Sequence, residues 1–461
     1  MRISTFVARA VAVAALVLCA GAAVAQTPPI YLYQSPGMAP GAAGDWSGSA
    51  VSHDGGWLAV GAPGYDDGDM IDSGRVGIFR WLAGKWRLIR WLQLSTLTGE
   101  SALVSARFGA AVSVSGDRVL IGCPNCRDGR AKAYLVDLDE TTQPPTFYKL
   151  YPAIISEPDF AFGIGSAVAL NGSIVAIGAP RGRSSSGGVE RGSVATGRFD
   201  GTTVIWEDVL FGPESPDGSR FGRSLALAST ASGTPLGGNY SLLIGAPAYN
   251  TGSGVAGSAY LYQRSHFVPG WDFRQQFENA TPGATDAMAT SVALDRASTE
   301  VDGYVVLGAP GRSVDGTPGG GVFVYRRAVG ESTYTFEKLV QHPDAESGDR
   351  FGIAVGIDGT RLVVGADGRA QNAATDEGRG YVFERFVLLG NAGWPWRQDL
   401  NFPGAGNVGI GRALTMSRKM VVLGAPYLAL DGSGVVTVYI CDAIFVHGFD
   451  GAAATRSCAL P

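Results

Sequence analysis

Short apolar runs that end in glycine recur along the whole chain. Runs such as RVLIG, SIVAIG and YVVLG are rich in β-branched residues and too short for helices, so they predict buried strands. An alternating segment such as AAVSVSG or SAVALNG precedes them, and the dipeptides Asn171-Gly172 and Asp358-Gly359 predict tight hairpins between the two strands. Two further alternating runs follow in most units, and the last is often aromatic. Each unit therefore predicts four antiparallel strands.

The buried runs share an ending, Gly-Ala-Pro or a close variant, that repeats at a regular interval. The seven copies begin at Gly61, Gly122, Gly178, Gly245, Gly308, Gly365 and Gly424. Successive copies are 56 to 67 residues apart, which indicates one supersecondary unit repeated seven times. Seven four-stranded antiparallel sheets predict an all-β fold, a seven-bladed β-propeller. An open solenoid is the alternative, but it needs polar capping repeats, which the sequence does not provide.

The two ends of the repeat array predict how the ring closes. The seventh unit ends at Val435–Ile440 without a fourth strand, whereas Ile30–Gln34 is a strand that belongs to no unit. Because exposed strand edges are a liability, we expect this N-terminal strand to complete the last blade. The propeller is predicted over residues 26–440, followed by a C-terminal tail over residues 441–461.

Both termini favour an exported protein. Arg2 and Arg9 precede an apolar stretch that ends in the small residues Ala23-Val24-Ala25, so residues 1–25 predict a signal peptide. A membrane-spanning helix is the alternative there, and no later segment is long and apolar enough to cross a bilayer. The tail resembles a short ending of some exported bacterial proteins, and it serves either sorting or the packing of a closed loop. The expected location is the periplasm or the outside of a bacterium.

Composition and charge narrow the classes of partner. The chain is 46% hydrophobic and 17% charged, with 67 glycines, which suits short strands joined by many turns. Removal of residues 1–25 takes away two arginines and no acids, so 34 Lys and Arg face 41 Asp and Glu and the net charge becomes −7. A surface of that sign disfavours nucleic acid and anionic membranes as partners.

The cysteines left after removal of the signal peptide are Cys123, Cys126, Cys441 and Cys458. An even number in an exported chain favours disulfides over metal binding. Pairing of the two close pairs is the simplest of three connectivities. A redox function of the CPNC segment is the alternative, although this segment ends a strand and lies in no βαβ unit.

Phe-Gly pairs stand ahead of four triplets, at Phe108-Gly109, Phe162-Gly163, Phe221-Gly222 and Phe351-Gly352. Together with the triplets they resemble the FG-GAP repeats of the integrin α-subunit β-propeller, over about residues 30–440. Three units depart from the pattern, with WSGSAV in unit one, AMATSVAL in unit five and Ile410-Gly411 in unit seven. The resemblance implies the same propeller fold, and it implies that ligands bind the face that carries the long loops.

Calcium is the cofactor that this resemblance raises. Integrin-type repeats often carry a loop D-x-D-x-D-G-x-x-D between their first two strands, whose oxygens suit a hard cation. Here that connection is mostly a tight hairpin, so the familiar calcium sites and any cofactor are expected to be absent. A different acidic cluster, in GYDDGDMIDSG, is a candidate metal site, with a solvated loop as the alternative; its carboxylates are Asp66, Asp67, Asp69 and Asp72.

Long variable segments follow the triplets and join the blades, and both sets emerge on one face of a four-stranded blade. Loops on a rigid scaffold are where binding residues concentrate. The leading hypothesis is therefore a non-enzymatic, exported binding or adhesion module that presents this face to a protein or glycan. A hydrolase or lyase with carboxylates at the mouth of the central channel is one alternative, and a structural envelope scaffold is another. The four histidines lie in different parts of the chain and accompany no nucleophile motif.

Overall fold

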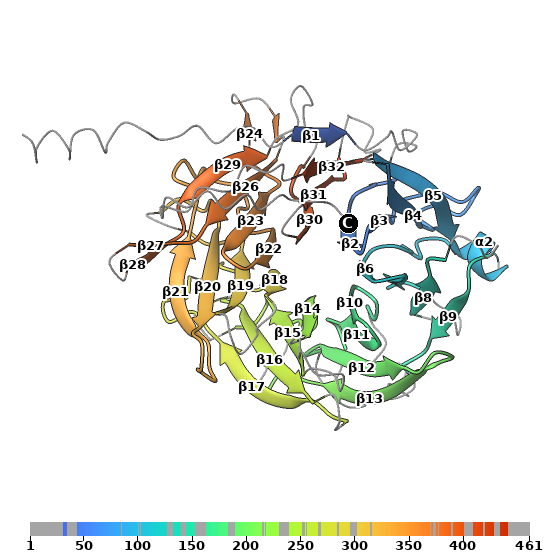
Figure 1. The fold of residues 1–461 in the computed structure, drawn as a ribbon, viewed down its shortest axis with the longest axis horizontal. Coiled ribbons are helices and arrows are strands. Elements are labelled where there is room, and N and C mark those ends of the chain that lie inside the picture. Colours follow the sequence, from blue (N-terminus) through green and yellow to red (C-terminus); the bar gives the residue numbers. More distant parts are fainter. Residues whose placement is uncertain are drawn as a thin grey trace, which may run out of the picture.

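A computed structural model describes residues 31–34 and most of 44–440 (Figure 1). The residues left out between 44 and 440 are 84, 100, 102, 127–131, 140–143, 153–162, 183–189, 214, 215, 217, 230–238, 251–253, 255, 266–268, 284, 296–301, 314, 315, 369, 372–374, 377, 389, 390, 401–408, 418, 419 and 428–433. The tail over residues 441–461 and its two cysteines lie outside the described residues.

The described chain forms seven four-stranded antiparallel sheets arranged as blades around a central opening (Figure 1). Blade 1 contains β2 (Ala50–Asp54), β3 (Trp57–Ala62), β4 (Arg75–Leu82) and β5 (Lys85–Gln93). Blade 2 contains β6 (Val112–Ser115), β7 (Arg118–Gly122), β8 (Ala133–Asp137) and β9 (Phe147–Leu150). Blade 3 contains β10 (Ala167–Asn171), β11 (Ile174–Ala179), β12 (Ser193–Phe199) and β13 (Val204–Leu210). Blade 4 contains β14 (Ser224–Ser229), β15 (Tyr240–Ala246), β16 (Ser258–Arg264) and β17 (Asp272–Phe277).

The second half of the ring repeats the same order. Blade 5 contains β18 (Ser291–Leu294), β19 (Gly303–Ala309), β20 (Gly321–Arg327) and β21 (Thr335–Val340). Blade 6 contains β22 (Ala354–Asp358), β23 (Arg361–Ala366), β26 (Arg379–Glu384) and β29 (Trp396–Leu400). Blade 7 contains β30 (Ala413–Ser417), β31 (Met420–Ala425) and β32 (Val435–Ile440), with β1 (Tyr31–Gln34) beside β32. Additional elements are the hairpins β24 (Ala370–Gln371) with β25 (Thr375–Asp376) and β27 (Phe386–Leu388) with β28 (Asn391–Gly393), and the short helix α2 (Leu94–Thr98).

The predicted seven-bladed β-propeller is confirmed. The first strand of each blade is innermost and contacts the first strand of the next blade, and β30 of blade 7 contacts β2 of blade 1 (Figure 1). The hairpins predicted at Asn171-Gly172 and Asp358-Gly359 also form, since Asn171 pairs with Ile174 and Gly172 has a φ of 57°. Within the described part of the chain, no helix has the length and apolar character needed to cross a membrane.

The hydrophobic core lies between adjacent blades. Ile78 of blade 1 and Val119 of blade 2 belong to one buried cluster, and Val324 of blade 5 shares another with Phe383 of blade 6. The second strand of each blade is buried along most of its length because both of its faces meet a neighbouring blade, which explains the continuous apolar runs in the sequence. A single blade has no core of its own, so its stability depends on the next blade.

Five of the outermost strands carry a β-bulge that places a large apolar residue at the periphery. The bulge in blade 4 falls opposite Tyr262, and the bulge in blade 5 falls opposite Tyr325. The residues at these positions, Phe273 and Phe336, remain 42% and 55% exposed. A bulge twists an edge strand and interrupts its free hydrogen-bonding edge, which lowers the tendency of the blades to pair with another chain.

The Phe-Gly and Gly-Ala-Pro motifs meet at every junction between blades. A Cβ built on Gly61, the triplet glycine of blade 1, would lie 2.0 Å from the carbonyl oxygen of Gly109 in blade 2. The equivalent distance is 2.1 Å from Gly178 to Gly222 and 1.9 Å from Gly424 to Gly48. No side chain fits at these contacts, so the glycines recur because the blades approach through their backbones.

The Phe-Gly motif itself is the centre of a four-residue turn, here called the junction turn. Its third residue, a glycine in six blades and Ala289 in blade 5, meets the triplet of the preceding blade, and its first residue has a positive φ in all seven blades. The first residues are Trp46, Arg107, Gly163, Arg220, Ala287, Arg350 and Gly409, with φ between 49° and 76°. In each turn the carbonyl oxygen of the first residue accepts a hydrogen bond from the N–H of the fourth residue.

The junction turn corrects the motif assigned to unit three. The Cβ built on Gly122 meets the carbonyl oxygen of Gly165, and the second residue of the turn is Ile164, which is 2% exposed. The motif predicted at Phe162-Gly163 is therefore displaced by two residues from the turn that contacts Gly122. The segment FGIG contains two glycines, and the sequence pattern did not distinguish Gly163 from Gly165. Unit seven follows the same pattern with Ile410-Gly411, and unit five uses Met288-Ala289.

The junction between blades 7 and 1 is built like the others. Ser47 forms a parallel β-bridge with Gly434, and the Gly424–Gly48 contact is as close as at any other junction. In addition, β1 pairs antiparallel with β32, with Leu32 opposite Tyr439. Closure of the last blade by this N-terminal strand stays a prediction, and its test is the deletion argued in the Discussion.

Candidate functional site

The carboxyl ends of the second strands and the junction turns lie on one side of the ring, here called the loop face. Backbone hydrogen bonds join the segment after each triplet to the next junction turn, as from Phe108 N to Ser73 O and from Phe221 N to Arg191 O. The fourth residue of each turn comes directly before or close to the innermost strand. These fourth residues therefore ring the mouth of the central channel; they are Ser49, Ala110, Ser166, Arg223, Thr290, Ile353 and Arg412.

Two of the seven positions at the channel mouth are arginines. Arg223 precedes β14 and Arg412 precedes β30, and these two strands lie on opposite sides of the central opening (Figure 1). Desolvation by the surrounding protein lowers the pKa of Arg223, and the positive charges of Arg412 and Arg220 lower it further. Two guanidinium groups from blades far apart in sequence thus act on each other across the mouth.

Arg412 is held by a buried carboxylate. Asp367, with a fully buried side chain, accepts a hydrogen bond of 3.1 Å from Arg412 and pairs with Arg350 at 2.9 Å. Asp367 occupies the third position of the triplet, where the other six units have proline. This substitution therefore supplies the ion pair that fixes the arginine of blade 7 at the mouth, while 34% of the Arg412 side chain stays accessible.

Arg220 and Arg223 lack such a partner. They are the first and fourth residues of the blade 4 junction turn, so their Cα atoms lie within the short span of a β-turn. Both side chains are exposed, and among the described residues no carboxylate forms an ion pair with either. Among the described residues, the loop-face mouth therefore carries positive charge without a paired carboxylate at Arg220 and Arg223, in a chain of net negative charge.

The carboxylates of the innermost hairpins lie at the opposite end of the channel. Asp54 accepts a hydrogen bond from the Gly116 N–H at 2.9 Å, and Asp295 accepts one from the Gly359 N–H at 3.0 Å. A five-residue innermost strand, roughly 17 Å long, separates these groups from the loop face. They serve the contact between neighbouring hairpins and do not neutralise the arginines at the mouth.

Other carboxylates of the loop face are buried within the junctions. Asp45 pairs with Arg75 at 3.1 Å, and Asp286 pairs with Arg312 at 2.7 Å. Asp349 accepts a hydrogen bond from the Glu346 N–H. Their exposed fractions are at most 4%, so these described carboxylates hold the blades together and do not form an open acid–base pair.

The acidic loop after the first triplet does not form a cluster. Asp66 Oδ1 accepts a hydrogen bond from the Asp72 N–H at 2.8 Å, and Asp67 accepts one from the Ser95 hydroxyl of helix α2. Across the described residues, no group of three or more His, Cys, Asp or Glu side chains is arranged to hold a metal ion. Two of the four candidate ligands thus serve the loop itself, and calcium binding by Asp66, Asp67, Asp69 and Asp72 stays a hypothesis.

Comparison with known protein families found a match to one part of the repeat array. The family model of the FG-GAP repeat matches residues 335–383, which run from β21 across the blade 5–6 junction into β26. This segment is similar to an FG-GAP repeat. It contains Phe351-Gly352 and the triplet at Gly365, the two motifs that meet neighbouring blades in the structure. A search among curated proteins found no match.

Solved β-propellers resemble the fold at low sequence identity. The β-propeller domain of the trilobed protease from Pyrococcus furiosus aligns over 81% of this chain and 90% of its own, at 10% identity and a TM-score of 0.43. The periplasmic gluconolactonase of Pseudomonas aeruginosa aligns over 77% and 85%, at 13% identity and a TM-score of 0.45. An ancestral GH74 enzyme aligns over 88% and 48%, at 12% identity and a TM-score of 0.49. No functional residue is carried from these alignments to this chain.

The FG-GAP repeat also borders a groove of about 500 Å³ on the outer side of blades 5 and 6. Arg385 of blade 6 pairs with Glu337 of β21 at 2.7 Å, and Trp394 donates a hydrogen bond of 3.0 Å to the same carboxylate. The groove is open, and the charged groups on its floor are paired with each other. These contacts fasten the β27–β28 hairpin to blade 5 and leave no free polar group among them to orient a ligand.

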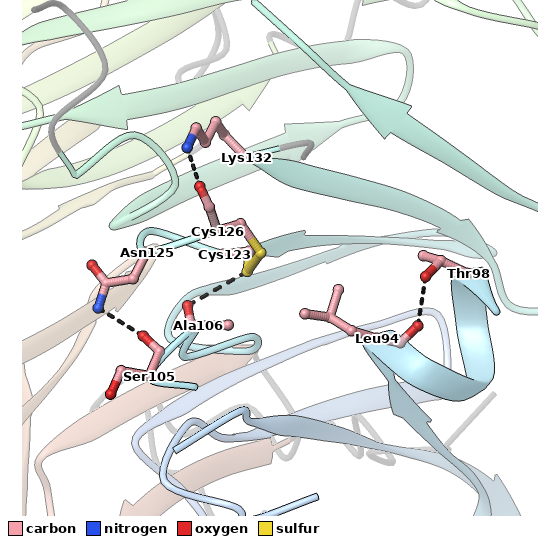
Figure 2. The surroundings of a disulfide bond; sticks show 8 residues. All are labelled: Leu94, Thr98, Ser105, Ala106, Cys123, Asn125, Cys126 and Lys132. Atoms are coloured by element: carbon pink, nitrogen blue, oxygen red, sulfur yellow. Dashed lines mark hydrogen bonds between the residues drawn. A yellow bond between two sulfur atoms is a disulfide. The ribbon is translucent and has the colours of Figure 1, made fainter. Parts of the chain in front are cut away.

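Cys123 and Cys126 are joined in the structure, with their Cα atoms 5.4 Å apart (Figure 2). Figure 2 shows the pair beside Asn125, whose side chain donates to the Ser105 carbonyl, and Lys132, which donates to the Cys126 carbonyl. Both cysteines are fully buried, whereas redox-active thiols are accessible to their substrates. The geometry favours a structural bond over the redox alternative; Cys441 and Cys458 lie outside the described residues.

Sequence reasoning missed the arginines at the channel mouth. The signal was present in two places, namely an arginine directly after the Phe-Gly or Ile-Gly pair in units four and seven, and an aspartate in the triplet of unit six. These residues differ from those at the equivalent positions of the other units. Their meaning appears only when the ring brings blades 4, 6 and 7 to one opening.

Proposed function

We propose that the chain is a non-enzymatic binding module that presents its loop face to a protein or glycan, with a role in adhesion or capture outside the cytoplasm. The observation that carries this proposal is that each repeat contains two kinds of segment with different roles. The repeated residues are used in contacts between blades, as at Gly178 and Gly222, whereas the segments after the triplets differ in length and sequence from unit to unit. Variable segments on a rigid ring are suited to recognition.

Export is part of the same proposal. Residues 1–25 have the order of charged, apolar and small residues of a signal peptide, which supports a periplasmic or secreted bacterial protein. For the alternative of a hydrolase or lyase, the carboxylates of Asp45, Asp286 and Asp367 give no support, because they are buried in ion pairs with arginines.

The test is a binding screen with the chain that begins at Gln26. Glycan arrays and bacterial or host surface-protein arrays should reveal a saturable ligand. Substitution of the exposed loop-face residues Ile71→Ser and Tyr427→Ser should weaken binding, whereas Phe273→Ser on an outermost strand serves as the matched control. Absence of binding together with turnover of a polymeric substrate would overturn the proposal.

A further inference from the structure

Three arginines gather where the central channel opens on the loop face. Arg220 and Arg223 bracket the junction turn of blade 4, and Arg412 takes the position equivalent to Arg223 in blade 7. Strands β14 and β30, which follow Arg223 and Arg412, face each other across the opening (Figure 1). The positive charges of Arg412 and Arg220 act on Arg223, which indicates that these side chains approach one another at the opening.

Within the described part of the chain, Asp367 is the one carboxylate that pairs with an arginine of this group. Asp367 is fully buried and is already shared by Arg350 and Arg412, at 2.9 Å and 3.1 Å. No described carboxylate pairs with Arg220 or Arg223, and the acidic groups Asp54 and Asp295 lie at the far end of the innermost strands. Desolvation by the surrounding protein, together with the positive charges of Arg412 and Arg220, lowers the pKa of Arg223, so this crowding disfavours its charged form.

Like charges held together at a narrow opening repel one another, and a bound anion removes that repulsion. The low-dielectric wall of the channel strengthens both effects relative to open water. Each guanidinium offers five N–H donors in a planar fork, which suits the paired oxygens of carboxylate, sulfate or phosphate groups. Arginine keeps its charge where a lysine would lose it, so the mouth stays cationic over the physiological pH range.

We propose that the loop-face mouth of the channel is an oxyanion site, in which Arg223 and Arg412 bind one carboxylate, sulfate or phosphate group and Arg220 adds positive charge beside it. Asp367 acts as a positioning residue, because it holds the Arg412 guanidinium at the mouth. This inference rests on the proposed binding function and narrows it to ligands that carry such a group. It also accounts for the two arginines and the aspartate that depart from the repeat.

The experiment measures anion binding by isothermal titration calorimetry at low ionic strength, with the chain from Gln26 to its end. The probes are sodium sulfate, sodium phosphate and an oligogalacturonate, with an uncharged oligosaccharide of similar length as the reference. The variants are Arg223→Gln and Arg412→Gln. The matched control is Arg274→Gln on the outermost strand β17, where the guanidinium is 51% exposed and pairs with Asp272.

Arg223→Gln and Arg412→Gln are each expected to weaken anion binding at least tenfold, whereas Arg274→Gln changes it less than twofold. Wild-type affinity should fall as salt is raised, since the interaction is between exposed charges. Binding of oligogalacturonate alone assigns a polymer-borne carboxylate as the ligand group, and binding of sulfate or phosphate alone assigns a free or ester-linked anion. Either result supports the site.

Two results of the titrations would overturn the oxyanion site. One is a wild-type chain that binds none of the three anions at millimolar concentration, and the other is equal weakening by Arg223→Gln and Arg274→Gln. A melting curve of Arg223→Gln checks that weaker binding does not come from unfolding. Its melting temperature should equal or exceed the wild-type value, because the substitution removes one of three charges that repel each other. If Arg223→Gln still binds the ligand found on the arrays with full affinity, the binding function stands and the oxyanion site fails.

Discussion

At the scale of single residues, the repeat motifs are explained by close backbone contacts. The triplet glycine of each blade lies where a Cβ would overlap a carbonyl oxygen of the next blade, and the junction turn begins with a residue at positive φ. The period of the triplets was therefore enough to predict the fold, because each copy marks one junction. Arg223, Arg412 and Asp367 were not predicted as a group, since their proximity depends on the closed ring and not on their spacing in the sequence.

Substitution of a triplet glycine tests this explanation. In Gly178→Ala the new Cβ would lie 2.1 Å from the Gly222 carbonyl oxygen, so the two blades must separate locally. We expect the free energy of unfolding to fall by about 3 kcal/mol or more, measured by chemical denaturation. Gly393→Ala is the control, because its nearest neighbour is a Pro395 carbon at 4.0 Å, and it should change stability by less than about 0.5 kcal/mol. Equal effects of the two substitutions would contradict the junction contact.

Calcium binding by the acidic loop is tested at the same scale. Asp66 and Asp67 already accept hydrogen bonds from Asp72 N–H and Ser95, so we expect equal melting temperatures in chelator and in 1 mM calcium. A site with a dissociation constant of about 10 μM would add about 2.7 kcal/mol under these conditions, which is easily seen as a shift of several degrees. A calcium-dependent rise that disappears in Asp69→Asn would show that this expectation is wrong.

At the scale of strands and blades, local sequence patterns predicted strands and hairpins, but they did not predict which distant segments contact each other. The four-strand order of each blade and the hairpins at Gly172 and Gly359 follow from alternation and turn residues, which act over a few positions. The motif of unit three was misplaced because FGIG contains two glycines, and only the contact with Gly122 distinguishes Gly165 from Gly163. The alternation of apolar and polar residues in the sequence did not reveal the bulges of the outermost strands.

The contact between the innermost strands of blades 1 and 7 is expected to depend on pH. The two ring nitrogens of His53 on β2 lie 3.1 Å from the Thr415 hydroxyl and 3.2 Å from the Ser417 hydroxyl, both on β30. Burial lowers the pKa of His53 to about 4, although the carboxylates of Asp54 and Asp358 act to raise it. The neutral imidazole is therefore the form that the folded ring accommodates.

The direction of the pH effect follows from this lowered pKa. An unfolded histidine takes up its proton near pH 6.5, whereas folded His53 does so only near pH 4, so the unfolded state binds more protons between these values. The free energy of unfolding should fall by about 1–3 kcal/mol as the pH decreases from 7 to 4. In His53→Gln this component of the pH dependence should be absent, as measured by denaturation at both pH values. An identical pH dependence of wild type and variant would refute the assignment.

At the scale of the whole molecule, the ring is a closed series of seven similar junctions. The junction between blades 7 and 1 contains the same glycine contact as the others, from Gly424 to Gly48, together with the His53 contacts to β30. Two separate sets of interactions are thus described at blade 7, namely this junction and the pairing of β1 with β32. The first set joins blade 7 to blade 1, and we expect the second to cover the outer edge of the last blade.

Deletion of residues 26–35 separates these two sets of interactions. The variant loses β1, and the apolar strand β32 then exposes the hydrogen-bonding groups that pair Val438 with Tyr33 and Tyr439 with Leu32. We expect a melting temperature several degrees below that of the chain from Gln26, and concentration-dependent association, because an uncovered apolar edge pairs with other chains. Deletion of residues 26–29 is the control, since it keeps β1. An unaltered melting curve after removal of residues 26–35 would mean that the blade 7–1 junction closes the ring by itself.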